Sequence, residues 1–401
     1  MKIDKIMREP IESLNYMERL VNNGSPSGFS FKYTTTQETS PLYVSQYNIC
    51  TLKQDNGQIH KLGQLPSLFE KKYPHLFFMH PDWKHVPQSI YVSDTDIAVI
   101  PTSSSRTVKL LNDDYYIKMC YPGILGRITR ELKTQHINSS IDITNILNEL
   151  LLKKSCPKQL SFFPEKGGKI YKYLDNEIGY VIRDAKPVGK NVENIISLIP
   201  AFSLYSKDRL NNDIPIILQI LDNHNNKLDF LLEQLLFPII DCYFYCVLNA
   251  GIQPEMHSQN FLIGLDYNLN ISSIVFRDLE SFDKDMDLIK TINPNTCIKS
   301  YPFKCIDSSQ YNYKIKHSFM FDHKLGEYFF DQLINTLNNY NIISNPFTLE
   351  NEIKTYVITK YGQLLTDYFP RDNRWYKFEN ILIDRDRSYR PYISFYPTKY
   401  R

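Results

Sequence analysis

The sequence predicts an α+β protein in which a strand-rich half is followed by a mainly helical half. Residues 76–200 contain short apolar strands separated by turn residues, whereas residues 212–401 mostly place apolar side chains at helical spacing. Strands followed by helices are typical of the α+β class. With 401 residues, of which 42% are hydrophobic, the chain can bury a large core. We expect one unit with lobes at 1–75, 76–210 and 211–401.

The strand-rich half is predicted to contain a β-hairpin. Residues 106–110 form one strand, residues 112–114 supply the turn, and residues 115–120 return. Pro122 and the glycine after it break the return strand, and residues 124–133 then predict a helix. A further helix is expected earlier, at about residues 10–22.

The hairpin region gathers hydroxyl and cationic side chains. These are Ser103, Ser104, Ser105, Arg106, Thr107, Lys118 and Arg130. Arginine offers a planar two-pronged donor, lysine a point charge, and hydroxyls with loop N–H groups bind phosphate oxygens. The set therefore suits a triphosphate or a polycarboxylate. A solvated hairpin with a polar turn is the alternative that stays open.

The helical half begins with a long apolar segment at residues 228–247. Its apolar side chains recur at helical spacing, a kink is expected at Pro238, and Gly251 is placed to end the helix. Because acidic residues interrupt the segment, it predicts a core helix rather than a membrane span.

A polar loop follows this helix. It carries Glu255, His257, Gln259 and Asn260. Strands at 261–265 and 271–276, joined by a turn, are expected to bring Asp278 back toward His257. A polar cluster on rigid supports is typical of an active site. The alternative for His257 is an ordinary core or loop histidine, and for Asp278 a turn-capping residue.

Both clusters resemble motifs of one known family, the NRPS-independent siderophore synthetases of the aerobactin-synthetase type, often called IucA/IucC-like. Residues 103–107 resemble the family's Ser-Ser-x-Arg-Thr element, and residues 257–260 resemble its His-x-Gln-Asn element. Arg277-Asp278 resembles the closing Arg-Asp of the family.

Three further elements agree in order and spacing with the family. Lys118 and Arg130 match its next lysine and a later arginine, and residues 80–84 resemble its His-Pro-x-x-Lys element. Residues 180–184 resemble a strand that ends in an arginine, here Arg183, and an acid. The agreement spans about residues 76–340, and the chain is shorter than the usual family member.

The resemblance implies a fold and an activity. The fold would be a cupped hand with a strand-rich fingers lobe, a mainly helical palm lobe that contains a β-hairpin, and a reduced N-terminal thumb lobe. The activity would be that of an ATP-dependent ligase in siderophore biosynthesis. Such an enzyme adenylates a di- or tricarboxylic acid such as citrate and condenses it with an amine or hydroxyl, releasing AMP and pyrophosphate.

The resemblance also implies roles for individual residues. ATP would be bound by Ser103, Ser104, Ser105, Arg106, Thr107, Lys118, Gln259, Asn260, His80 and Lys84. Mg²⁺ would be held by Glu255 and Asp278, because this hard cation prefers carboxylate and phosphate oxygens. The catalytic residues would be His257, Arg130 and Lys118, with His257 and Arg130 binding the acid.

Two other functions stay open. A kinase-like small-molecule phosphotransferase would also place a histidine loop after a buried helix. It would, however, carry an aspartate where this chain has Gln259, and a Gly-rich loop of a kind that the 14 glycines here do not form. A non-catalytic relative that binds a nucleotide or polycarboxylate would explain the reduced N-terminal lobe. The retained Lys118, His257 and Asp278 argue against it.

The composition limits the kinds of binding partner and the cellular compartment that we expect. A net charge of +2, from 46 basic and 44 acidic residues, gives no reason to expect a nucleic-acid partner. Seven cysteines without a CxxC pair are typical of a reducing compartment, and the N-terminus lacks the apolar core of a signal peptide. We expect a cytoplasmic protein with small-molecule acid and amine substrates and no membrane partner. A homodimer is left open.

Overall fold

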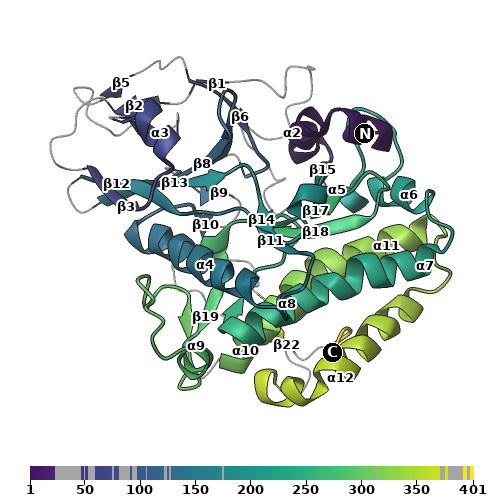
Figure 1. Ribbon diagram of the computed structural model, residues 1–401. Coiled ribbons are helices and arrows are strands. Elements are labelled where there is room, and N and C mark those ends of the chain that lie inside the picture. Colours follow the sequence, from purple (N-terminus) through teal and green to yellow (C-terminus); the bar gives the residue numbers. More distant parts are fainter. Residues whose placement is uncertain are drawn as a thin grey trace.

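The computed structural model confirms the α+β class. The residues that it describes are 1–22, 47–48, 50–52, 59–74, 76–80, 91–92, 97–104, 106–121, 124–125, 128–173, 176–310, 313–370, 375–377, 392–394 and 398–401. Figure 1 shows a strand-rich lobe at the upper left and a mainly helical lobe at the lower right, with a second sheet between them.

The strand-rich lobe is built on a seven-stranded antiparallel sheet. In spatial order its strands are β1 (Tyr47–Asn48), β6 (Ala98–Pro101), β7 (Thr107–Leu110), β8 (Tyr115–Met119), β13 (Asn176–Asp184), β12 (Gly167–Tyr173) and β3 (Ile59–Gly63). The predicted hairpin is the β7–β8 pair, in which Thr107 lies opposite Lys118, and Arg183 on β13 lies opposite Tyr116 on β8. Opposite residues share a face, as do residues two apart on a strand. Thr107, Lys118 and Arg183 therefore project to the same side of the sheet.

A helix that was not predicted supports this lobe. It is α4, Thr134–Leu152, whereas the helix predicted over residues 124–133 is wrong. Two short paired strands, β9 (Ile124–Leu125) and β10 (Ile128–Thr129), lie there instead. At the start of the helix the carboxylate of Glu177 on β13 accepts hydrogen bonds from the Thr134 N–H (2.9 Å) and hydroxyl (3.0 Å), and Nδ1 of His136 accepts one from the Lys133 N–H (3.0 Å). The sequence pattern could not show a cap that comes from a distant strand.

The five-stranded sheet lies between the lobes. Its order is β14 (Val188–Gly189), β11 (Leu160–Phe162), β18 (Ile271–Phe276), β17 (Phe261–Leu265) and β15 (Ser197–Pro200). The strands predicted at 261–265 and 271–276 are confirmed as β17 and β18, and every residue of both is buried. Complete burial explains why apolar residues predominate in both strands rather than alternate with charged ones.

The long apolar segment forms a single helical stretch in the core of the second lobe. It consists of α7 (Lys227–Asp229), the π-helical turns η4 (Phe230–Leu236) and α8 (Phe237–Ala250). Pro238 lies where the π turns give way to the α-helix, and Gly251 ends it with φ of 64°. By length and composition this is the one helix among the described residues that could cross a membrane. Since 67% of its most apolar window is buried inside the protein, it is a core helix of this fold.

The other elements surround these sheets. The helices are α1 (Ile3–Arg8), α2 (Pro10–Leu20), α3 (Ser67–Lys72), η3 (Val192–Asn194), α5 (Ala201–Tyr205), α6 (Ile216–Leu221), η5 (Leu279–Ser281), α9 (Met286–Ile292), α10 (Tyr313–Ser318), η6 (Phe319–Phe330), α11 (Asp331–Asn339) and α12 (Pro346–Tyr368). The strands are β2 (Cys50–Leu52), β4 (Phe77–Met79), β5 (Tyr91–Val92), β16 (Ile252–Gln253), β19 (Asp283–Asp285), β20 (Cys305–Ile306), β21 (Trp375–Lys377) and β22 (Tyr392–Ser394).

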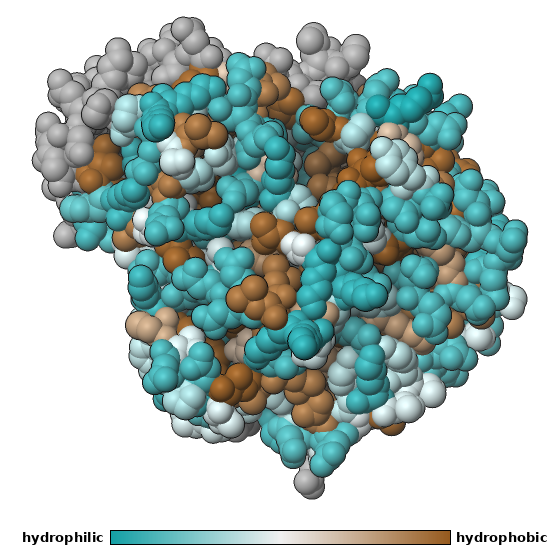
Figure 2. All heavy atoms as spheres, viewed as in Figure 1, coloured by the Kyte–Doolittle hydropathy of each residue, from teal (hydrophilic) through white to brown (hydrophobic). Residues whose placement is uncertain are grey.

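The visible surface is mostly hydrophilic. Figure 2 shows teal side chains over most of this face, with apolar side chains between them. The exposed large apolar residues come from separate elements, such as Leu68 on α3, Leu152 at the end of α4 and Phe347 on α12. Exposed apolar residues scattered in this way are normal for folded proteins and identify no interaction site.

Replacing Gly251 by alanine should destabilise the protein by about 1–3 kcal/mol. The position requires a positive φ, and the added Cβ would lie 2.8 Å from the backbone nitrogen of Ile289. Gly362→Ala is the matched control, because Gly362 lies within α12 and its added Cβ would have no neighbour nearer than 3.9 Å. That variant should gain up to about 1 kcal/mol of helix propensity. Urea denaturation measures both, and equal effects at the two positions would contradict the prediction.

Candidate active site

A narrow crevice of about 10 Å³ lies where the strand-rich lobe meets the five-stranded sheet. The residues that line it are Thr102, Ser103, Ser104, Thr107, Arg183, Gln259, Arg277 and Asp278. They include members of both predicted clusters, and the side chain of Gln259 donates a hydrogen bond to the Ser103 hydroxyl (3.2 Å) although 156 residues separate the two. The fold therefore brings the two predicted clusters together.

The turn between β6 and β7 owes its shape to its own hydroxyl groups. The Thr102 N–H and hydroxyl both donate to the carbonyl oxygen of Thr107, each at 2.9 Å. The Thr107 N–H in turn donates to the Ser104 hydroxyl (3.1 Å). Short hydroxyl side chains compete well for backbone groups in this way. The Ser/Thr-rich motif therefore forms a tight turn that faces the crevice.

A buried ion-pair network lies beside the crevice, with Lys118 at its centre. The Lys118 ammonium, on a side chain that is only 1% exposed, lies 2.9 Å from Glu280 and 3.4 Å from Asp278. The Arg106 guanidinium lies 3.0 Å from the same oxygen of Glu280. Breaking a buried pair by removing one partner typically costs about 3–5 kcal/mol, because the other charge is left without compensation. These contacts therefore hold β7 and β8 against the segment after β18.

Arg183 extends the network to a third carboxylate. Oε1 of the fully buried Glu165 accepts from both Nε (2.8 Å) and Nη2 (2.7 Å) of Arg183, and Arg183 also contacts Asp278. Burial alone would lower the pKa of Arg183, but Glu165 and Asp278 raise it above its ordinary value. Glu165 thus fixes the direction in which Arg183 points, as expected for a two-pronged contact.

Asp278 and Glu280 of the network are ionised. Burial alone would raise the pKa of Asp278, but Lys118, Arg183, Arg277 and Arg106 hold it well below the ordinary value. For Glu280 burial is likewise outweighed by Lys118 and Arg106, which lower the pKa to about 2. The site is therefore a compensated set of positive and negative charges at neutral pH.

His257 is a neutral side chain in this site. Burial lowers its pKa to about 4, although Glu255 opposes the shift. The Gln259 N–H donates to Nδ1 of His257 (3.2 Å), so Nδ1 is the acceptor and the ring proton is assigned to Nε2. The ring therefore offers one N–H donor at neutral pH.

A second positive region surrounds Glu255. The Lys324 ammonium, from the π-helical η6, lies 2.7 Å from Glu255, and the Asn260 amide donates to the same carboxylate at 3.4 Å. Burial works against ionisation of Glu255, but Lys324 and Lys304 pull its pKa far below the ordinary value. Arg130 is also within electrostatic reach, since Glu255 is among the carboxylates that affect its pKa. Burial and Arg106 nevertheless lower the pKa of Arg130.

Two buried donors in the crevice have no partner. Within the described part of the chain, the Thr107 hydroxyl and Nη2 of Arg277 are buried and make no hydrogen bond. An unsatisfied buried polar group costs about 1–3 kcal/mol, and more when it is charged. Two such donors beside Arg183 suit an anionic ligand whose oxygens would satisfy them.

The other predicted residues are placed as follows. His80 is buried after β4, with its ring edge-on to Tyr121 at 4.7 Å, and it is not among the described residues that line the crevice. Lys84 and Ser105 lie outside the described residues.

The motifs in the sequence did not point to four charged residues of the site, the carboxylates Glu165 and Glu280 and the lysines Lys304 and Lys324. Only Glu280 carried a local signal, because it follows the Arg-Asp motif by two residues.

The donor set fits a magnesium ion that is shared with phosphate oxygens. In the ranges that the structure describes, no three His, Cys, Asp or Glu side chains converge as a complete metal site. Mg²⁺ usually takes only one or two carboxylates and completes its shell with phosphates and water. Asp278 can serve with Glu280, since both contact Lys118 and Oε2 of Glu280 is buried without a hydrogen bond. The predicted partner Glu255 is held by Lys324 and Asn260, and its metal role stays a prediction.

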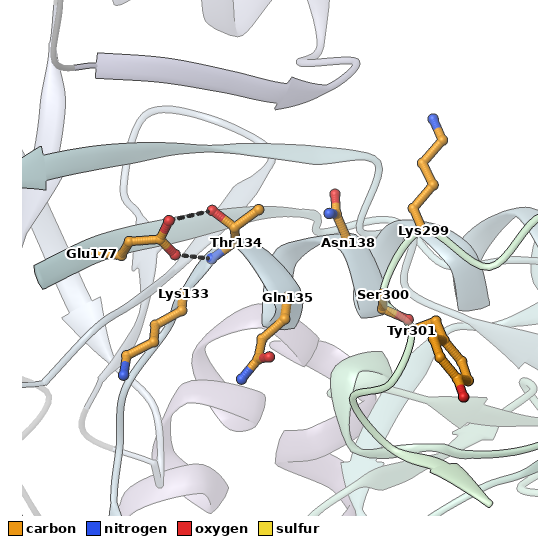
Figure 3. A pocket seen from close by; sticks show the side chains of 8 residues that line it. All are labelled: Lys133, Thr134, Gln135, Asn138, Glu177, Lys299, Ser300 and Tyr301. Carbon is orange, nitrogen blue, oxygen red and sulfur yellow. Dashed lines mark hydrogen bonds between the residues drawn. The ribbon is translucent and has the colours of Figure 1, made fainter. Parts of the chain in front are cut away.

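A larger cavity of about 450 Å³ lies elsewhere. Its lining comprises Lys133, Thr134, Gln135, Asn138, Glu177, Lys299, Ser300 and Tyr301. Figure 3 shows Thr134 bonded to Glu177 in its wall. None of the predicted site residues lines this cavity. On α4, Ser139 instead bonds the main-chain oxygen of Glu280, beside the ion-pair network.

The His257 ring should titrate near pH 4, far below the 6.5 of an ordinary histidine. Between these values the unfolded chain takes up a proton that the folded chain does not. Stability should therefore fall as the pH drops from 6.5 to 4, by about 3 kcal/mol at most from this group. His257→Asn, which keeps an acceptor near the Nδ1 position, should remove this part of the loss.

NMR titration of the ring protons measures the pKa, and the signal that disappears in His257→Asn assigns it. A ring that titrates near 6.5 would show a solvated histidine and contradict the described environment.

The comparisons with known proteins identify the fold. No model of a known protein family matches the chain, and no curated protein matches it significantly. Among solved structures, the petrobactin biosynthesis protein AsbB from Bacillus anthracis matches 88% of this chain and 68% of its own, with 15% identity and a TM-score of 0.67. The ATP-bound aerobactin synthetase IucA from Klebsiella pneumoniae matches 98% of this chain and 79% of its own, with 14% identity and a TM-score of 0.69.

The aerobactin synthetase IucC from the same organism matches 85% of this chain and 66% of its own, with 11% identity and a TM-score of 0.62. At such identities the likeness concerns the fold. The resemblance predicted from the sequence is thus confirmed at that level: this chain has the fold of the siderophore synthetases.

Proposed function

We propose that the protein is an ATP-dependent ligase, which adenylates a carboxylic acid and joins it to an amine or hydroxyl. The observation that carries the proposal is the crevice, where two motifs far apart in sequence meet around two unpaired buried donors. The fold adds support, since one of the similar structures is an ATP-bound synthetase. The enzyme would act in the cytoplasm on small molecules.

The nucleotide phosphates would lie along the crevice. Thr107 and Arg277 would donate their unpaired groups to phosphate oxygens, and Ser103 with Ser104 would line the opposite wall. The described crevice holds little more than a water-sized group. Binding of a triphosphate would therefore need the Gln259–Ser103 hydrogen bond to open, so that the turn that carries Ser103 moves while Gln259 and Arg277 stay in contact.

The charge network would change partners when ATP binds. Lys118, Arg106 and Arg183 are neutralised by Asp278, Glu280 and Glu165. Mg²⁺ held by Asp278, with Glu280 or Glu255, would supply positive charge that offsets the phosphates. Lys118 and Arg106 would then turn from carboxylate to phosphate oxygens. The compensated network thus links nucleotide binding to metal binding.

The acid would bind at the opposite end of the site. The Nε2–H of neutral His257 and the Arg130 guanidinium would bind its carboxylates, and Lys304 and Lys324 make the surroundings positive. A carboxylate oxygen would attack the α-phosphorus, forming the acyl-adenylate as pyrophosphate leaves. The amine or hydroxyl would then attack the acyl carbon and release AMP. Lys118 would offset the negative charge on the phosphate oxygens in the first step.

With ATP, Mg²⁺ and citrate, the protein should release pyrophosphate, and hydroxylamine should trap the activated acid as a hydroxamate. Chelation of the metal with EDTA should abolish both signals. Release of ADP and phosphate instead would contradict adenylation and favour a phosphotransferase. ATP binding without turnover across a panel of acids and amines would favour a relative that only binds.

Replacing Thr107 by valine should have opposite effects on stability and on binding. The free protein should gain about 1 kcal/mol, because a buried hydroxyl without a partner is removed. ATP binding should weaken by about 3- to 10-fold, because one donor to phosphate is lost. Calorimetric titration and thermal unfolding measure the two effects.

Thr291→Val provides the matched control, since Thr291 is exposed on α9. It should leave ATP binding unchanged. Unchanged ATP binding in Thr107→Val would remove Thr107 from the proposed nucleotide site.

A further inference from the structure

We propose that Glu18, on the N-terminal helix α2, is a positioning residue that directs Arg277 toward the bound phosphates. The inference rests on the proposed function, because it concerns the same crevice. Glu18 belongs to none of the sequence motifs, and its segment was expected to be only a reduced lobe.

Glu18 joins two groups that line the crevice. Its side chain is buried, with 3% of the residue exposed. Oε2 accepts a hydrogen bond from the Ser103 N–H (3.1 Å), and Oε1 forms an ion pair with Nη1 of Arg277. One carboxylate therefore bridges the turn after β6 and the segment after β18.

These contacts close a ring of four residues. Nε of Arg277 donates to the carbonyl oxygen of Gln259 (2.6 Å), and the Gln259 side chain donates to the Ser103 hydroxyl (3.2 Å). The Ser103 N–H donates to Glu18, and this contact closes the ring. Each residue of the ring comes from a different segment, so the ring ties α2, both motif loops and the end of β18 together.

The ring determines the orientation of the Arg277 guanidinium. This group is planar and its donors have fixed directions. The Gln259 carbonyl oxygen accepts from Nε and Glu18 pairs with Nη1, so these two contacts fix the plane of the guanidinium. Nη2 is the one nitrogen of the group that neither contact uses. That nitrogen is buried without a hydrogen bond, and Arg277 lines the crevice. Glu18 thereby leaves one charged donor available for a ligand.

The helix that carries Glu18 is rigidly supported. Met17 and Val21 are buried in the main hydrophobic core, and α2 packs beside β15 (Figure 1). The Ser203 hydroxyl donates to the carbonyl oxygen of Val21 (2.8 Å), which holds the end of the helix. A carboxylate on such a support is suited to positioning.

The same contacts allow an opposite role, in which Glu18 occupies donors that phosphate would otherwise use. Removal of the negative charge would then strengthen ATP binding, whereas loss of a positioning residue weakens it. The core packing of α2 favours positioning, because a competing carboxylate would have to withdraw when ATP binds.

Glu18→Gln tests the role, since glutamine keeps an acceptor for the Ser103 N–H and loses the ion pair. Calorimetry should show ATP binding weaker by about 10- to 100-fold, the effect of one charge-assisted hydrogen bond. The KM for ATP should rise by more than kcat falls. Glu12→Gln, an exposed change on the same helix, is the control and should bind ATP like the unaltered protein.

A double-mutant cycle distinguishes positioning from a general loss of structure. If Glu18 acts through Arg277, Glu18→Gln should have no further effect on ATP binding in an Arg277→Gln protein. Additive effects of the two changes would overturn the inference. If Glu18→Gln does not fold, Glu18→Asp keeps the charge on a shorter side chain and should give a smaller loss.

Hydrogen exchange provides a readout without ATP. The amides of residues 102–104 should exchange faster in Glu18→Gln than in Glu12→Gln. If the unaltered protein binds no ATP, the proposed function fails. If it binds ATP and Glu18→Gln binds it equally or more tightly, the positioning role fails while the proposed function stands.

Discussion

The ion pairs of the buried Lys118 ammonium with Asp278 and Glu280 are the interaction on which the rest of the site depends. A buried charge without compensation costs several kcal/mol, so strand β8 and the segment after β18 must stay in contact once Lys118 is buried. This requirement joins the strand-rich lobe to the five-stranded sheet. It also places the hydroxyl turn after β6 against the loop that carries His257. The candidate site therefore lies where charged side chains of the strand-rich lobe and of the segment after β18 neutralise one another.

The same arrangement recurs around the crevice, because each of three guanidinium groups is contacted by a buried carboxylate. Glu165 holds Arg183, Glu280 contacts Arg106, and Glu18 holds Arg277. A two-pronged or bridging carboxylate restricts the direction of a planar donor, which a long flexible side chain cannot do alone. Through Glu18 the N-terminal helix becomes part of the site, although the resemblance pointed to this region as the reduced one.

Much of the site could be predicted, because local patterns encode it. The β7–β8 hairpin, the buried strands β17 and β18 and the helix that ends at Gly251 follow from turn residues, apolar runs and a glycine with positive φ. The helix expected over 124–133 failed for the converse reason. Two short strands lie there, and α4 begins only at Thr134, where Glu177, more than 40 positions away, accepts hydrogen bonds from Thr134. No local pattern records such a partner.

The sequence by itself indicated the candidate site residues and most of the strands and loops on which they lie, because motif order and secondary structure depend on near neighbours along the chain. Only the tertiary structure decided which carboxylate faces which cation. Glu18, Glu165 and Lys324 are ordinary charged residues in their local sequence, and their burial against Arg277, Arg183 and Glu255 makes them members of the site. Charge pairing of this kind depends on burial and distance, which arise only when segments remote in sequence pack together.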